Sequence, residues 1–145
     1  MPDPVNLTGE IAAAIDGAAL RGHQLALAYV RDDGTPSVSF RGSTYVRSST
    51  ELAIWARKRD SGLAAAISNR PRVSLVSFEM DGPGARYLAI EGRARVAAEL
   101  DDEVSGAIID PERQQDPEHK GIAVVVDVDS VVGASANGFF QQTRG

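Results

Sequence analysis

The chain has 145 residues, of which 43% are hydrophobic and 24% charged, and this balance is typical of one soluble globular domain. Its formal net charge of −5 argues against a general nucleic-acid-binding protein, and the absence of cysteine excludes disulfides, thiolate metal sites and thiol catalysis. No apolar run approaches the roughly 20 residues of a membrane helix, and the polar N-terminus is not a signal peptide, so we expect a cytoplasmic protein that binds neither nucleic acid nor membrane.

The chain is expected to begin with a short helix that packs closely on a sheet. Thr8 is its predicted N-cap and Gly22 its predicted end. Between them, small and branched apolar residues such as Ile11 and Ile15 recur at helical spacing and form one narrow face.

Most of the remaining chain has the pattern of antiparallel strands. Asp33-Gly34 is typical of a tight hairpin, and Gly92 interrupts a long strand as a bulge would. A second helix is expected to start at Asp101, with Val104, Ala107 and Ile108 facing inward, and to be followed by a polar surface loop over residues 110–120. The predicted strands cover residues 24–30, 36–40, 43–47, 52–56, 73–79, 86–96 and 121–128, and Val131-Val132 follows the last of them.

Six or seven strands with two or three short helices predict a mainly β, antiparallel barrel with helices at its ends. No internal repeat and no second domain is evident, so residues 1–145 are expected to form a single domain. Residues 1–6 and 134–145 are expected to be flexible tails.

Residues 52–76 are the part of the chain around which the rest is expected to be organised. An apolar run contains Trp55, the cluster Arg57-Lys58-Arg59 follows, and a short helix is predicted to begin at Asp60 or Ser61 and to end before Pro71. Three cationic side chains beside a helix start favour a bound anion such as a phosphate. The alternative is a solvated basic cluster in which Asp60 caps the helix.

The sequence offers few groups for catalysis by the protein alone. His23 and His119 are too few and too far apart to indicate a metal site or a catalytic triad, and no Walker or Rossmann glycine loop is present. We therefore predict no catalytic side chain and no metal ligand, and expect a bound cofactor to carry any chemistry. Trp55 is either a platform for the cofactor ring or a core or interface residue.

Four segments, in this order, resemble the pyridoxamine 5'-phosphate oxidase-like split β-barrels. This family includes enzymes that use flavin mononucleotide (FMN) and reductases that use the deazaflavin F420. The resemblance implies a Greek-key split barrel and a homodimer with two cofactors in clefts between the subunits. It covers residues 25–132, and the segments that carry it are LALAYVRDDGTPSVSF, NRPRVSLVSF, YLAIEGRARV and GIAVVVDVDSVVG.

The same resemblance implies where the cofactor phosphate is held. Arg41 matches the arginine that opens the family's phosphate-binding strand, and Ser61 matches the serine of its Ser-x-Lys helix motif. Two of the family's lysines fall on Leu63 and Val46 in this chain. Either the cluster that begins at Arg57, where the family has a hydroxyl residue, supplies the charge from a shifted position, or the cleft holds another ligand such as haem or a fatty acid.

The expected function is that of an FMN- or F420-dependent oxidoreductase that transfers hydride between the cofactor and a small-molecule substrate. The alternative functions are a non-catalytic binding protein for haem or another tetrapyrrole, with His23 or His119 as axial ligand, and a structural or regulatory dimer with an empty cleft. The predicted cofactor-binding residues are Arg41, Ser43, Trp55, Arg57, Lys58 and Ser61.

Overall fold

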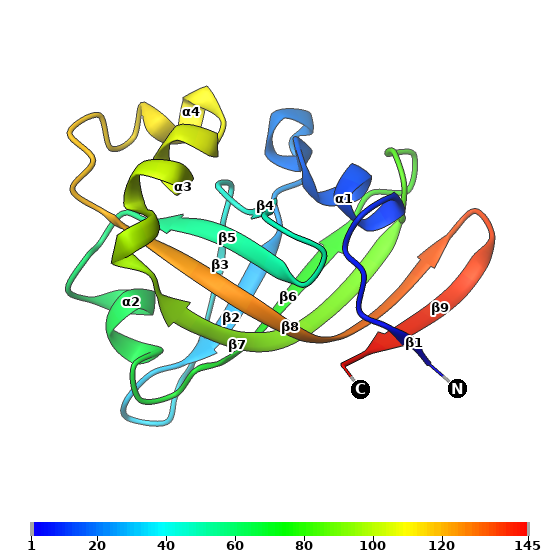
Figure 1. The fold of residues 1–145 in the computed structure, drawn as a ribbon, viewed down its shortest axis with the longest axis horizontal. Coiled ribbons are helices and arrows are strands. Elements are labelled where there is room, and N and C mark those ends of the chain that lie inside the picture. The colour runs from blue at the N-terminus through cyan, green and yellow to red at the C-terminus, as the bar shows by residue number, and fades with distance from the viewer. Residues whose placement is uncertain (1, 145) are drawn as a thin grey trace.

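The computed structural model describes residues 2–144 and places their nine strands in one mixed sheet (Figure 1). The long strands are those that the sequence predicts, and the fold is mainly β with short helices, as expected. The strands are β1 (Asp3–Pro4), β2 (Ala26–Val30), β3 (Pro36–Phe40), β4 (Tyr45–Val46), β5 (Glu51–Ala56), β6 (Arg72–Phe78), β7 (Tyr87–Val96), β8 (Ile122–Ser135) and β9 (Gly138–Thr143).

The sheet branches at β8 and remains open between β3 and β5. One path runs in the order β1-β9-β8-β7-β6-β2-β3, while β5 pairs with the first half of β8 and carries β4 on its other edge. No strand ladder within residues 2–144 joins β3 to β5. The barrel is therefore split at this point, and the ends of β3 and β5 that flank the opening lead into residues of the predicted phosphate site.

The helices are short and lie around the sheet. They are α1 (Glu10–Ile15), α2 (Gly62–Ala66), α3 (Asp101–Ala107) and α4 (Asp110–Arg113), with 3₁₀ turns at Ala18–Arg21 and Ala98–Leu100. Figure 1 shows α3 and α4 at the end of the molecule beyond β5, and α2 on the opposite side of that strand. In the described part of the chain, none of these helices is long and apolar enough to cross a bilayer.

The first helix differs from its prediction at both ends. Thr8 is not the N-cap, because both its backbone N–H and its hydroxyl donate to Asn6 Oδ1, at 3.1 and 2.6 Å. Gly9 takes the N-cap position instead. The α-helix ends before Gly17, whose φ of 77° is left-handed, and a 3₁₀ turn then continues to Gly22.

Three further predictions need correction. Ala107 is exposed and does not face inward, because the buried residues of α3 are Val104 and Ser105. Ile108, the residue after the helix, is buried as expected. Residues 110–113 form α4 within the expected loop. The two ends of the chain, expected to be flexible tails, form strands: β9 pairs antiparallel with β8, and β1 pairs parallel with β9.

The bulge predicted at Gly92 is confirmed. The pairing of β7 with β8 shifts between Glu91 and Gly92, and Asp129 is the extra residue on β8. A Cβ on Gly92 would lie 2.4 Å from the carbonyl oxygen of Asp127. Only glycine allows the two backbones to approach this closely.

The strand β5 is buried on both faces, and this explains why LAIWA is continuously apolar instead of alternating. One face contributes Leu52 and Ile54 to the main core inside the barrel. The other face contributes to a second cluster beneath α3, composed of Ala53, Trp55, Val104, Ile108 and Ala123.

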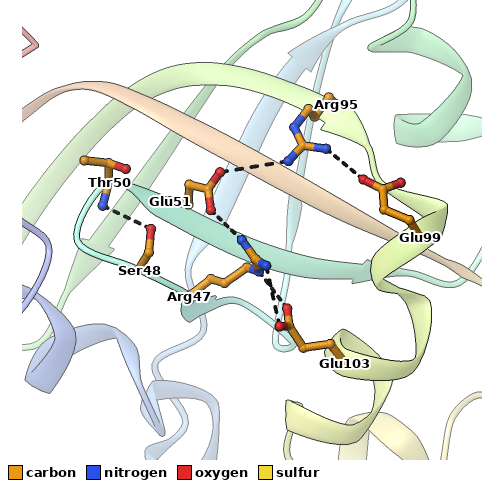
Figure 2. A network of polar contacts seen from close by, with 7 residues as sticks. All are labelled: Arg47, Ser48, Thr50, Glu51, Arg95, Glu99 and Glu103. Atoms are coloured by element: carbon orange, nitrogen blue, oxygen red, sulfur yellow. Dashed lines mark hydrogen bonds and ion pairs between the residues drawn. The ribbon is translucent and has the colours of Figure 1, made fainter.

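A network of ion pairs fixes α3 to the sheet (Figure 2). Arg47, which follows β4, donates to Glu51 at 2.6 Å and to Glu103 on α3 at 2.6 Å. These hydrogen bonds raise the pKa of Arg47 above its ordinary value. Arg95 on β7 pairs with Glu99 at 3.2 Å, and its distance to Glu51 is 3.9 Å.

The outer face of the sheet carries an exposed apolar row. The strand registers place Phe40, Ala26, Val76, Ala89 and Val132 side by side across five strands. Phe40 is 73% exposed, and Val76 and Val132 are each more than 40% exposed. A row of this kind is a candidate interface, because monomers rarely expose a contiguous apolar face.

Candidate functional site

The opening between β3 and β5 contains a cavity of about 410 Å³. Its walls come from β2, from β3 and the residue after it, from the end of β5, and from the turn that leads into α2. The lining residues are Tyr29, Ser37, Ser39, Phe40, Arg41, Ala56, Arg57, Lys58, Ser61, Gly62 and Leu63.

One wall is built by the alternation of side chains along β3. Ser37, Ser39 and Arg41 are half-buried and share one face, whereas Val38 and Phe40 are exposed on the other. The backbone N–H of Arg41 donates to the carbonyl of Leu25 at 2.8 Å, which holds the end of this wall on the preceding segment. Strand periodicity therefore sets Arg41 at the cavity.

Two polar atoms on this wall are buried without a partner. Ser39 Oγ and Arg41 Nε make no hydrogen bond within residues 2–144, and no ion pair in this range involves Arg41. Leaving such groups unsatisfied costs about 1–3 kcal/mol each, and more for a charged group. A ligand that accepts hydrogen bonds from both would remove this cost.

The opposite wall is the end of β5. Arg57 and Lys58 directly follow Ala56, and neither side chain forms an ion pair within the described residues. Arg59, the third cation of the cluster, is occupied elsewhere: its Nη1 donates to the carbonyl of Gly121 at 2.7 Å and to Asp101 Oδ2 at 3.2 Å. The cavity thus receives two cations from this turn and one, Arg41, from the residue that follows β3.

The electrostatics of the cavity favour an anion. Burial lowers the pKa of Arg41 from its ordinary value; the nearby Tyr29 opposes this effect, and the positive charge of Arg57 adds to it. None of the eleven lining residues carries a carboxylate, although the whole chain has a net charge of −5. Three cations without a counterion in an acidic protein form a site for a negatively charged group.

The helix start contributes less than the sequence predicts. The helix α2 begins at Gly62, with Ser61 as N-cap, and neither Ser61 nor Asp60 makes a side-chain capping bond. At five residues it is little more than one turn, so its dipole is small. Ser61 nevertheless lines the cavity.

The structure brings together four of the six predicted site residues: Arg41, Arg57, Lys58 and Ser61 all line the cavity. Ser43 and Trp55 do not. The Ser43 hydroxyl accepts from the backbone N–H of Trp55 at 2.9 Å and donates to its carbonyl at 3.3 Å. The Trp55 indole lies in the second cluster and donates to Asp116 Oδ2 at 2.8 Å.

The sequence reasoning missed six other lining residues, which are Tyr29, Ser37, Ser39, Phe40, Ala56 and Gly62. The alternation of PSVSFR was the available signal, since it places both serines on the face of Arg41. Leu63, which stands where the resemblance implies a lysine, is buried in the cavity wall.

Neither histidine belongs to the cavity lining. His23 is exposed, and its Nδ1 lies 3.2 Å from the carbonyl oxygen of Phe78. His119 is exposed in the loop before β8. The cavity lining therefore offers oxygen, guanidinium and ammonium groups but no imidazole.

The comparisons with known proteins agree with this architecture. No protein-family model matches the sequence, and no curated protein matches it. Solved structures do match. A pyridoxamine 5'-phosphate oxidase-related, FMN-binding protein from Nostoc punctiforme is 15% identical, with a TM-score of 0.65, and the match covers 93% of this chain and 86% of that one.

Two other solved structures that match this fold are named for other proteins. An F420 reductase is 21% identical, with a TM-score of 0.56, over 86% of this chain and 95% of that one. HupZ from Group A Streptococcus is 11% identical, with a TM-score of 0.62, over 86% and 92%. Similarity at these identities is similarity of fold. The chain has the split-barrel fold of pyridoxamine 5'-phosphate oxidase-like proteins, as the sequence resemblance predicts.

Proposed function

We propose that this protein is an FMN- or F420-dependent oxidoreductase whose cavity binds the phosphate of the cofactor. The observation that carries the proposal is the set of three cations, Arg41, Arg57 and Lys58, that line one cavity with no carboxylate among them. Both cofactors carry a phosphate, and arginine grips phosphate oxygens through a planar fork.

The residues of the cavity fit such a group. Arg41 Nε and Ser39 Oγ are donors without a partner in the described chain, and the hydroxyls of Ser37 and Ser61 lie in the same lining. The bound cofactor supplies hydride transfer, and the protein binds and orients it. The buried side chain of Leu63 gives one wall an apolar surface. We propose no side-chain acid or base.

We also propose that a second copy of the chain covers the exposed apolar row on the outer face. Phe40 belongs both to this row and to the cavity lining, so a partner on the outer face would lie beside the cofactor. The split-barrel resemblance implies a cofactor between two subunits, and the position of Phe40 is consistent with that arrangement. The small-molecule substrate would then enter between the two copies.

Haem binding has weaker support in this structure. The axial ligands expected for haem are His23 and His119, and neither histidine lines the cavity. The absorbance spectrum of the freshly purified protein separates the possibilities: a flavin or deazaflavin absorbs near the blue, haem gives a Soret band, and an empty cavity gives neither.

The phosphate site is tested by titrating FMN and F420 into variants at fixed salt. Each charge-assisted hydrogen bond contributes about 1.5–3 kcal/mol, so Arg41→Ala and Arg57→Ala should each weaken binding by roughly 10- to 100-fold. Arg93→Ala is the matched control: it loses the same charge, but Arg93 pairs with Asp129 at 3.0 Å and does not line the cavity. Unchanged affinity in both cavity variants would refute the proposed site.

A further inference from the structure

The turn that carries Arg57 and Lys58 has a tightly packed support behind it. Gly121, just before β8, lies against the end of β5, and a Cβ at this position would be 2.3 Å from the carbonyl oxygen of Ala56 and 3.0 Å from Arg57 Cα. Such contact allows no side chain. The Ala56–Arg57 peptide, from which the cationic turn starts, therefore rests directly on the backbone of Gly121.

Asp116 fixes this support in place. Its Oδ2 accepts the backbone N–H of Gly121 and the indole N–H of Trp55, each at 2.8 Å. Its Oδ1 accepts the backbone N–H of Lys120 at 2.9 Å. One carboxylate thus joins the loop before β8 to the last but one residue of β5.

The ionised form of Asp116 suits this role. Burial disfavours the charged carboxylate, but the three hydrogen bonds from Lys120, Trp55 and Gly121 outweigh burial, and the pKa of Asp116 lies below its ordinary value. The carboxylate is therefore charged and able to accept all three bonds near neutral pH.

Arg59 provides a second attachment on the same support. Its guanidinium donates to the Gly121 carbonyl at 2.7 Å, so Gly121 is held through its N–H by Asp116 and through its carbonyl by Arg59. Lys58 lies between two fixed points, the end of β5 and Arg59. The other cation, Arg41, directly follows β3 and is held separately by the hydrogen bond that its backbone N–H donates to the carbonyl of Leu25.

We infer that Asp116 is a positioning residue for the proposed phosphate site: through Trp55 and Gly121 it sets the place from which Arg57 and Lys58 reach into the cavity. Asp116 does not itself line the cavity. The inference rests on the proposed function, since it concerns how that site is held.

The sign of the effect separates positioning from simple electrostatics. Asp116→Asn removes a negative charge from the neighbourhood of an anion site, so the electric field alone would make cofactor binding tighter. The loss of position predicts the opposite. The carboxylate now accepts hydrogen bonds from three N–H groups. The NH2 group of asparagine is itself a donor and would face one or more of these N–H groups, so the support for the Ala56–Arg57 peptide would loosen.

The test measures the affinity of each variant of the full-length protein for FMN or F420, whichever of the two the parent binds more tightly. Asp116→Asn should weaken binding by ~10-fold, the lower end of what losing an outer-shell partner costs at metal sites. Glu103→Gln is the matched control, because it also removes one negative charge and an ion pair, but its partner Arg47 does not line the cavity. It should leave the affinity unchanged.

A double-mutant cycle then locates the effect. Asp116→Asn should be less than additive with Arg57→Ala, because the part of the support that acts through Arg57 is lost with that side chain, and additive with Arg41→Ala. Trp55→Phe removes the indole N–H without a change of charge and should reproduce the pattern if Asp116→Asn does not fold. Tighter or unchanged binding in Asp116→Asn, or equal coupling to both arginines, would overturn the inference while leaving the phosphate site intact. A parent that binds neither cofactor would overturn the proposed function and this inference with it.

Discussion

Replacing Arg41 with methionine should change stability in opposite directions with and without the cofactor. Arg41 is half-buried, its Nε has no hydrogen-bond partner in the described chain, and Arg57 lies near enough to lower its pKa further. Methionine keeps much of the stem and removes the charge. An unsatisfied buried polar group costs about 1–3 kcal/mol, so the cofactor-free Arg41→Met protein should be more stable by about 1 kcal/mol. For a domain of this size that corresponds to a rise in Tm of roughly 2–4 °C.

With FMN present the order should reverse. At a ligand concentration of ~100 times its Kd, the parent gains about 2.7 kcal/mol. A variant that binds ~100-fold more weakly gains only ~0.4 kcal/mol at the same concentration, by the same relation. The parent should therefore have the higher Tm once FMN is added.

Thermal unfolding with and without FMN, and with F420 in a parallel series, measures both effects. Arg93→Met is the control, because Arg93 is exposed and paired with Asp129. It should not raise the Tm of the cofactor-free protein, and it should leave the gain from the cofactor unchanged. If Arg41→Met is less stable than the parent without a cofactor and gains as much from it, the cavity does not hold an unpaired charge for a phosphate.

Three further predictions concern the histidines, the outer face and Tyr45. Neither His23→Ala nor His119→Ala should lower turnover by the ~10²-fold typical of a lost general acid or base, since neither residue lines the cavity; a loss of that size in a turnover assay would reveal a missed role. Phe40→Asp should convert the proposed dimer into a monomer by light scattering, and a stable, folded parent monomer at micromolar concentration would refute the dimer. Burial raises the pKa of Tyr45, so the neutral phenol stabilises the fold below the unfolded-state pKa of about 10, and this contribution is lost as the pH rises further. The buried hydroxyl of Tyr45 has no hydrogen-bond partner within residues 2–144, so Tyr45→Phe should not lower the free energy of unfolding at neutral pH. In urea titrations at alkaline pH, the variant should lose less stability than the parent. A large loss of stability at neutral pH would contradict this prediction.

The strands could be predicted because their signals are local. The hairpin at Asp33-Gly34 and the bulge at Gly92 follow from backbone conformations and close approaches that glycine permits. The continuous apolar run of β5 was also recognisable as a strand, although the sequence could not show that α3 covers one face and the barrel core the other. Local signals failed at the first helix, where Asn6 occupies the Thr8 hydroxyl.

The site was only partly predictable, because contacts between residues distant in sequence decide which of the candidate side chains reach the cavity. Arg41, Arg57 and Ser61 could be named from the family resemblance and the basic cluster. Nothing near Trp55 indicated that Asp116, 61 residues later, accepts its indole N–H and keeps it away from the cavity. Likewise, Arg59 belongs to the same basic run as Arg57, and only the fold shows that it pairs with Asp101.

The central claim is that this cavity recognises the phosphate of a flavin or deazaflavin, and one measurement tests it most directly. The affinities of the parent protein for FMN and riboflavin are compared at fixed salt, as are those for F420 and the deazaflavin chromophore without its phosphate-bearing chain. The three cations of the lining predict that at least one phosphorylated compound binds ~100-fold or more tightly than its phosphate-free counterpart. Equal affinity within both pairs would contradict the account.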